Sequence, residues 1–178
     1  MKTLVEYLDR HKHKRIQKVY KYHPSTNKEL KSIIEDRIKK EGKECDLNDI
    51  DVSKITDMTD LFGNFYNSDF NGDISEWDVS NVENMNFMFA NSKFNGDISK
   101  WDVSNVKNII YMFDNSNFNG DISKWDVSKV INMRRMFARS KFNGDISDWD
   151  VSNVRDMSDM FYKSPLENNP PVWYKNKN

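Results

Sequence analysis

Residues 94–104 read FNGDISKWDVS, and this segment recurs at residues 70–80, 118–128 and 142–152 with only its seventh residue changing. A Met-Phe pair follows each copy, at residues 88–89, 112–113, 136–137 and 160–161. Successive copies are 24 residues apart. A fixed period of about 20 to 50 residues is typical of stacked repeat proteins, because one unit cannot bury its apolar face without its neighbours. The segment therefore predicts a short repeat solenoid.

A weaker copy of the pattern precedes the four clear ones. Residues 46–53 align with residues 72–80, and Leu61-Phe62 aligns with Met88-Phe89 at an offset of 27 residues. The three extra residues fall in 63–69, so the first loop is longer than the others. We expect about five 24-residue coils over residues 46–165, with residues 1–45 as a basic helical N-terminal cap and residues 166–178 as a C-terminal cap and tail.

Within one unit the spacing of apolar residues changes. Ile98, Trp101 and Val103 end in an alternating pattern, which is typical of a short strand. Apolar residues then recur at helical spacing within residues 104–113. Ser80 and Glu83 also have the spacing of a helix capping box. Each coil is therefore predicted to be turn, short strand, short helix and return loop, which makes the fold an α/β repeat.

These units resemble the BspA-type repeats of bacterial surface proteins, a divergent group similar to leucine-rich repeats. The resemblance rests on the FNGDIS and WDVS motifs with the following Met-Phe pair, and it covers residues 46–165. It implies a leucine-rich-repeat-like solenoid with a parallel sheet on one face and helices on the other. It also implies a secreted or lipid-anchored protein with a role in adhesion, although fold-level resemblance does not transfer function.

The charge distribution divides the chain. Residues 1–45 hold 13 Lys or Arg and 7 Asp or Glu, whereas the remainder holds 14 and 21. Cys45 is the only cysteine, so no intramolecular disulfide can form. The N-terminal residues carry charges where a signal peptide needs an apolar stretch, and no segment is long and apolar enough to span a membrane. We expect a cytoplasmic protein of a bacterial host cell, without a membrane partner, in contrast to the surface members of the family.

Residues 26–29 read as a second capping box, with Thr26 at the N-cap and Glu29 three residues on. Apolar residues follow at helical spacing, and Gly42 is placed to end the helix. We expect this helix to cover the first coil through Leu30, Ile33, Ile34 and Ile38. A shorter helix is expected around Leu4, Tyr7 and Leu8.

The basic run at residues 11–18 leaves three interpretations open. It is a solvated surface, a contact for an acidic protein, or a site for nucleic acid, since clustered Lys and Arg attract phosphate. His11 and His13 lack the further ligands that a zinc site needs.

The repeated residues have structural explanations. The Phe, Trp and Met-Phe positions are predicted to fill the core, and the repeated Asn (Asn71, Asn95, Asn119, Asn143) to form a ladder that satisfies backbone groups between coils. Two columns of Asp would repel unless each accepts backbone hydrogen bonds in its own turn. Calcium is the alternative, although the spacing matches neither an EF-hand nor a glycine-rich calcium repeat.

No catalytic constellation is present. The three His lie in the first 45 residues, and there is no P-loop, dinucleotide fingerprint or Cys set for a metal. We expect neither an enzyme nor a cofactor, a metal or a small-molecule substrate.

Function is expected where the copies differ. Outward positions of the second to fourth coils change from polar to apolar, aromatic or Arg residues, which is the composition of protein-binding hot spots. Surface drift or packing between coils is the alternative. The predicted partner-binding residues are Phe87, Ile110, Tyr111, Ile131, Arg134, Arg135 and Arg139.

The sequence thus predicts a non-enzymatic intracellular repeat module that binds a protein. One concrete version is an inhibitor carried by a phage or mobile element against a host defence protein such as a CRISPR nuclease. The alternatives are a surface protein that functions in adhesion, and a protein that binds nucleic acid through its basic N-terminal region.

Overall fold

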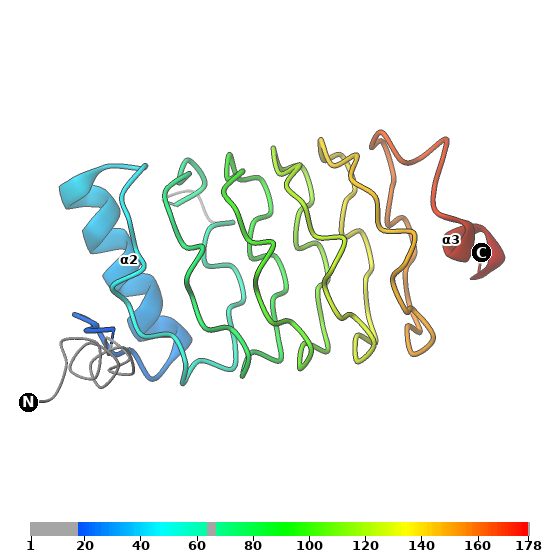
Figure 1. The fold of residues 1–178 in the computed structure, drawn as a ribbon. Coiled ribbons are helices and arrows are strands. Elements are labelled where there is room, and N and C mark those ends of the chain that lie inside the picture. The colour runs from blue at the N-terminus through cyan, green and yellow to red at the C-terminus, as the bar shows by residue number, and fades with distance from the viewer. Residues whose placement is uncertain (1–17, 64–66, 178) are drawn as a thin grey trace, which may run out of the picture.

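The fold is built around one long helix and a row of coils. The computed structural model describes residues 18–63 and 67–177, and in this part of the chain two helices occur, α2 (Asn27–Glu41) and α3 (Val172–Lys177). Figure 1 shows α2 at one end of a row of side-by-side coils and α3 at the other end. The predicted helix at Leu4–Leu8, His11, His13 and the basic run up to residue 17 lie outside the described residues.

Helix α2 begins and ends where the sequence predicts. The Thr26 hydroxyl accepts a hydrogen bond from the Glu29 N–H, and the Glu29 carboxylate accepts one from the Ser25 N–H at 2.7 Å. At the other end, Gly42 has a φ of 92° and donates its N–H to the Ile38 carbonyl. Both ends of the helix therefore have partners for backbone groups that would otherwise be unpaired.

One face of α2 packs against the first coil. Leu30 and Ile34 are fully buried in the same core as the coil residues. The guanidinium of Arg37 lies at the edge of this contact, where it pairs with Asp49 at 2.6 Å and with Glu41 at 2.7 Å. The helix thus covers the apolar end of the row of coils, as its apolar spacing predicts.

Backbone hydrogen bonds join each coil to the next. The Phe87 N–H donates to the Ile110 carbonyl at 2.9 Å, and the Tyr111 N–H donates to the Arg134 carbonyl at 2.9 Å. Isolated parallel bridges follow the same order, linking Asp57, Asn84, Asn108, Asn132 and Asp156 in turn. Each residue therefore lies beside its equivalent one unit along the chain.

The predicted α/β repeat solenoid is wrong in its secondary structure. Across the described coil residues there is no strand, no sheet and no helix, only turns and isolated bridges. The residues expected to form a helix, 104–113, do bury Val106, Ile109 and Met112. Their N–H groups, however, donate to tight turns or to the next coil, as from Ile109 to Asn132, rather than four residues back. An apolar residue every third position reflects successive turns here, not a helix.

The predicted capping box at Ser80 and Glu83 fails for the same reason. The Ser80 hydroxyl donates to Asp78 at 2.6 Å, and the Glu83 N–H donates to the Thr56 carbonyl of the preceding coil. The short strand predicted at residues 98–103 is also absent, since the Trp101 N–H closes a turn onto the Ile98 carbonyl.

The core consists of aromatic columns that run along the row. The rings of Phe94 and Phe118 stack at 6.4 Å, and a second column stacks Phe89 on Phe113 at 5.5 Å. All four are fully buried. Ring pairs of this kind add about 0.5 to 1.5 kcal/mol beyond their burial. The prediction that these Phe residues form an internal spine is confirmed.

The Trp residues tie neighbouring coils together. The Trp101 indole N–H donates to the Ile74 carbonyl at 3.2 Å, and the Trp125 indole N–H donates to the Ile98 carbonyl at 3.1 Å. Trp173 of α3 makes the same bond, to the Ile146 carbonyl at 2.9 Å. It lies 24 residues after Trp149, just as Leu166 lies 24 after Phe142. The C-terminal segment therefore keeps the register at these two positions, although the rest of its sequence departs from the repeat.

The repeated Asn and Asp side chains carry out local bonding. The Asn95 N–H donates to the Asn71 Oδ1 at 2.7 Å, and the same bond recurs at Asn119 and Asn143. This is the predicted ladder, but it is exposed rather than buried. Each Asp of the FNGDIS motif accepts from the Ser two residues on, for example Asp97 from the Ser99 N–H at 2.9 Å.

Candidate protein-binding surface

A column of left-handed residues runs along the outside of the coils. Phe87, Tyr111 and Arg135 have φ values of 58°, 56° and 52°, and Asp60 and Asp159 at the two ends of the column have 57° and 55°. Asp tolerates this conformation because its short side chain can hydrogen-bond locally, whereas bulky side chains there are uncommon. The three central residues therefore hold a backbone conformation that their side chains disfavour.

Inter-coil hydrogen bonds hold these residues in place. The Phe87, Tyr111 and Arg135 N–H groups each donate to the next coil, at 2.9, 2.9 and 3.0 Å. The side chains consequently lie at one equivalent position on three successive coils. A rigid backbone thus fixes their spacing before any partner arrives.

The side chains of this column contact one another. The Phe87 and Tyr111 rings stack at 5.0 Å with an interplanar angle of 12°. The Arg135 guanidinium lies 5.8 Å from the Tyr111 ring centre and 5.9 Å from that of Tyr162. We call Phe87, Tyr111, Arg135 and Tyr162 the aromatic–arginine strip. Its two ends are the most open, since Phe87 is 40% exposed and Tyr162 is 38% exposed.

Asp159 fixes the orientation of the arginine. The Arg135 Nε and Nη2 atoms lie 2.9 and 2.7 Å from the same Asp159 oxygen. This bond raises the pKa of Arg135, so the guanidinium stays charged. An exposed pair contributes little stability, about 0 to 1 kcal/mol, but two donors to one carboxylate hold the guanidinium plane in position.

The strip offers ring edges rather than ring faces to a partner. The Tyr111 face toward Phe87 is covered by that ring, and the Arg135 guanidinium lies over the Tyr111 ring. Single-stranded nucleic acid is bound by stacking bases on open aromatic faces. The geometry of the strip therefore favours side chains that pack against ring edges, as in protein interfaces.

The structure divides the seven residues predicted from the sequence. It brings Phe87, Tyr111 and Arg135 into one strip. Ile110 and Arg134 precede Tyr111 and Arg135 in the chain, where Ile110 is half-buried and Arg134 is exposed. Ile131 is 39% exposed but lies in a different column, beside Lys107 and Arg155 through backbone bonds.

Arg139 belongs to a second left-handed column. Its φ is 56°, and Asn91, Asn115 and Lys163 hold the equivalent positions. Its guanidinium forms an ion pair with Asp114, whose side chain is only 6% exposed. The other carboxylate oxygen of Asp114 is buried without a partner among the described residues. Arg139 is thus committed to a structural pair and is not part of the strip.

Sequence reasoning missed Tyr162 and the role of Asp159. Tyr162 falls one repeat after Ala138 and two after Asp114, at a position that is buried in those coils. A large aromatic residue at a position otherwise held by a buried small residue was a visible signal. Asp159 was placed in the right column, but its pairing with Arg135 depends on the geometry of the turns.

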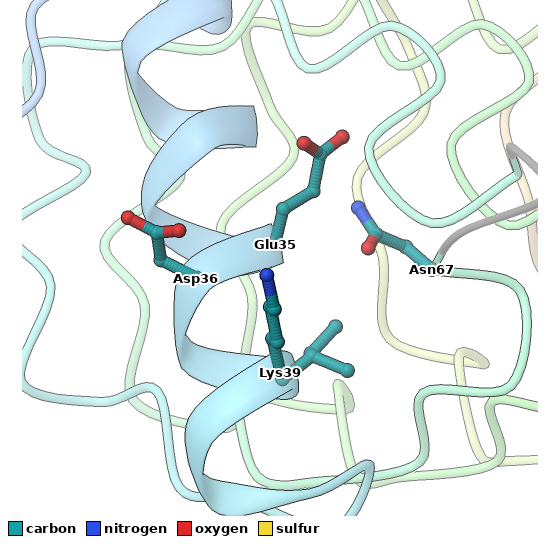
Figure 2. A pocket seen from close by; sticks show the side chains of 5 residues that line it. Glu35, Asp36, Lys39 and Asn67 are labelled. Carbon is teal, nitrogen blue, oxygen red and sulfur yellow. The ribbon is translucent and has the colours of Figure 1, made fainter.

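The hollows of the surface do not resemble a catalytic site. The hollow in Figure 2 has a volume of about 410 Å³ and lies between α2 and Asn67, with Glu35 and Asn67 facing each other across it. The Asn67 amide is already committed to the Leu61 carbonyl at 3.0 Å. A second hollow, of about 190 Å³, is lined by Asp121, Lys124 and Asp145, whose carboxylates accept Ser N–H bonds.

Two searches within the described residues found nothing. No group of three or more His, Cys, Asp or Glu residues is placed to hold a metal ion. Neither described helix has both the length and the apolar character required to cross a bilayer.

Comparison with known proteins gives a family. A family model described as "Mycoplasma protein of unknown function, DUF285" matches residues 28–139 and 111–171, which together make up most of the chain. No curated protein matches this chain, and no solved structure matches it.

Proposed function

This chain belongs to the DUF285 family of Mycoplasma proteins of unknown function, and we propose that it is a non-enzymatic module that binds a protein partner through the aromatic–arginine strip. The observation that carries the proposal is the left-handed backbone of Phe87, Tyr111 and Arg135. Three bulky side chains are displayed at positions that would suit Asn, Asp or Gly better.

The energies of the strip do not explain it by stability alone. A non-glycine residue held in the left-handed region costs about 1 to 3 kcal/mol. The stacked pair and the exposed cation–π contact each return about 0.5 to 1.5 kcal/mol. The two contributions are of similar size, so the strip is close to neutral for folding. Its exposed aromatic edges and fixed guanidinium are the chemistry of binding hot spots.

Within the family we infer that the repeats are of the BspA type. The FNGDIS and WDVS motifs with the following Met-Phe pair support this assignment. Adhesion at a cell surface is then the alternative setting for the same strip. Cell fractionation combined with protease treatment of intact cells separates this alternative from an intracellular module, such as an inhibitor of a CRISPR nuclease.

The test replaces the strip with residues that the backbone prefers. Phe87→Asn, Tyr111→Asn and Arg135→Asn are combined in one variant, because Asn tolerates a left-handed φ. We expect stability to stay within about 1 kcal/mol of the parent, since relief of strain offsets the lost ring contacts. Affinity for the partner should fall about thirtyfold or more, as hot-spot residues each contribute about 2 kcal/mol.

The matched control changes three residues on another face of successive coils. Lys100→Asn, Lys124→Asn and Asp148→Asn remove exposed charged side chains at equivalent repeat positions. Both variants and the parent are used as bait in native host lysate, with quantitative mass spectrometry. The proposal requires that one protein be retained by the parent and the control but lost by the strip variant. If the strip variant retains everything that the parent retains, the strip is not the binding surface.

A further inference from the structure

The two ends of the row of coils differ in how their backbone groups are satisfied. Inside the row, each coil directs a set of N–H groups at the carbonyls of the next. Asp60 donates to Asn86 at 3.0 Å and Phe62 donates to Met88 at 2.9 Å, and the pattern repeats in later coils. Every coil therefore presents carbonyls toward α2 and N–H groups toward α3.

At the α2 end the carbonyls are covered by side-chain amides. The carbonyls of residues 57, 59 and 61 are the equivalents, 27 residues earlier, of those of residues 84, 86 and 88. The Asn27 Nδ2 donates to the Asp57 and Thr59 carbonyls at 3.2 and 3.1 Å. The Asn67 Nδ2 donates to the Leu61 carbonyl at 3.0 Å. Two Asn side chains thus replace a preceding coil.

At the α3 end the N–H groups have no such replacement. Arg135 and Arg139 donate to the Ser158 and Tyr162 carbonyls, but among the described residues nothing accepts from the N–H groups of Asp159 and Lys163, one repeat later. The same holds for Met157 and Phe161 between and beside them. We call the backbone of residues 157–163 the open edge.

Helix α3 covers the core of this last coil but not its outer side. Tyr174 packs edge-on against the buried Phe161 ring at 4.9 Å, and Trp173 lies beside the same ring. The side chains of Asp159 and Lys163 are exposed. The interior of the coil is therefore closed, while its outer N–H groups face solvent.

We propose that the open edge binds an extended, acidic segment of another protein, which supplies backbone carbonyls to these N–H groups. A row of unpaired N–H groups at alternate residues is a template for strand addition. A second copy of this chain is a poor occupant, because its own carbonyl row is covered by Asn27, Asn67 and α2. This surface is distinct from the strip, although Asp159 belongs to both regions.

Charge selects the acidic character of the segment. Residues 130–140 and 154–164, the outer halves of the last two coils, hold five cations and two carboxylates. One of those carboxylates, Asp159, is occupied by Arg135. Arg155 and Lys163 are exposed beside the open edge. The partial positive charge of the free N–H groups adds to this field, so acidic side chains on the incoming segment are favoured.

The experiment follows the two exposed amides one by one. The ¹⁵N-labelled full chain is mixed with a ten-residue peptide of alternating Thr and Glu, and a peptide of alternating Thr and Lys serves as the control. We expect the acidic peptide to slow hydrogen exchange at Asp159 and Lys163 by about tenfold or more at saturation, while Arg135 and Arg139, one repeat earlier, stay unchanged. The basic peptide should slow neither.

Variants test the charge requirement without removing an N–H group. Arg155→Gln with Lys163→Asn should weaken binding of the acidic peptide about tenfold, since Asn tolerates the left-handed φ of residue 163. Lys100→Gln with Lys124→Gln lowers the net charge equally and should bind as the parent does.

Three results would overturn the proposal. The acidic peptide could leave both amides unprotected at saturating concentration. The two peptides could protect them equally. The amides could also be protected in the free protein in a concentration-dependent way, which would identify a second copy of this chain as the occupant.

Discussion

At the scale of single residues, the repeated Asp side chains show how like charges are tolerated in a column. Asp97 accepts from Ser99, and Asp121 accepts from Ser123, each at 2.9 Å from the backbone N–H. The Ser99 bonds lower the pKa of Asp97 and outweigh both burial and the repulsion from Asp73. Local hydrogen bonds therefore decide the protonation state, as the sequence interpretation without calcium expects.

This bonding predicts an acid-sensitive fold. The pKa values of Asp73, Asp97, Asp121 and Asp145 are all lowered in the folded chain, chiefly by hydrogen bonds from Ser. Their stabilisation is therefore complete above about pH 4, the range of an unfolded Asp, and is lost as the pH falls through the lower folded values. Asp69, held by Lys43 and Lys93, has its pKa lowered to about 2 and marks the acid end of this window.

The measurement compares Tm against pH for the parent and for a variant with Asn at these four positions. Asn keeps the acceptor oxygen but does not titrate, so Tm at pH 7 should change little. Below about pH 4 the variant should lose stability less steeply, because up to about four fewer protons are taken up on unfolding. Parallel curves for parent and variant would show that other groups control acid unfolding.

At the scale of elements, the contrast between α2 and the coils shows what local sequence can decide. Helix α2 was predictable because its caps, Thr26 with Glu29 and Gly42, lie within the helix itself. The coils were misassigned because their N–H groups find acceptors 24 residues away, as from Tyr111 to Arg134. Apolar spacing shows which residues are buried, but not whether a helix or a series of turns buries them.

The attachment of α2 to the first coil can be tested at Asn27. Its amide donates to two carbonyls of that coil, so Asn27→Ala leaves both without this partner. We expect a loss of about 1 to 2 kcal/mol in the free energy of unfolding, measured by urea denaturation. Lys28→Ala, at an exposed position on the same helix, is the control and should change stability by less than about 0.5 kcal/mol. Equal effects of the two substitutions would show that Asn27 acts only through helix propensity.

At the scale of the whole molecule, the repeat fixes neighbours in space but not the conformation at each position. The sequence predicted that Phe87, Tyr111 and Arg135 share a column, and the structure places them in one. It could not reveal their left-handed backbone or the capped and open edges. Those features arise from turns and from the side chains of Asn27 and Asn67, which belong to no repeated position.

Because each coil bonds only to its neighbours, removing one whole unit should preserve the fold. Deleting residues 94–117 joins Lys93 to Phe118 and keeps every column in register, so Phe70 can stack on Phe118 and Phe87 can donate to Arg134. We expect a cooperatively folded protein whose urea m-value is about an eighth smaller, in proportion to the lost length.

Deleting only residues 94–105 is the matched control. It places Val106 where Phe94 stood and leaves the third unit without its Phe, its Trp and its Asp turns, so two aromatic columns are interrupted and the indole bond to Ile74 is lost. That variant should unfold without a cooperative transition in circular dichroism. The in-register deletion must retain both the transition and the spectrum of the parent. If it loses the transition too, contacts beyond adjacent coils hold the molecule together, and the open edge of the last coil would no longer be an independent feature.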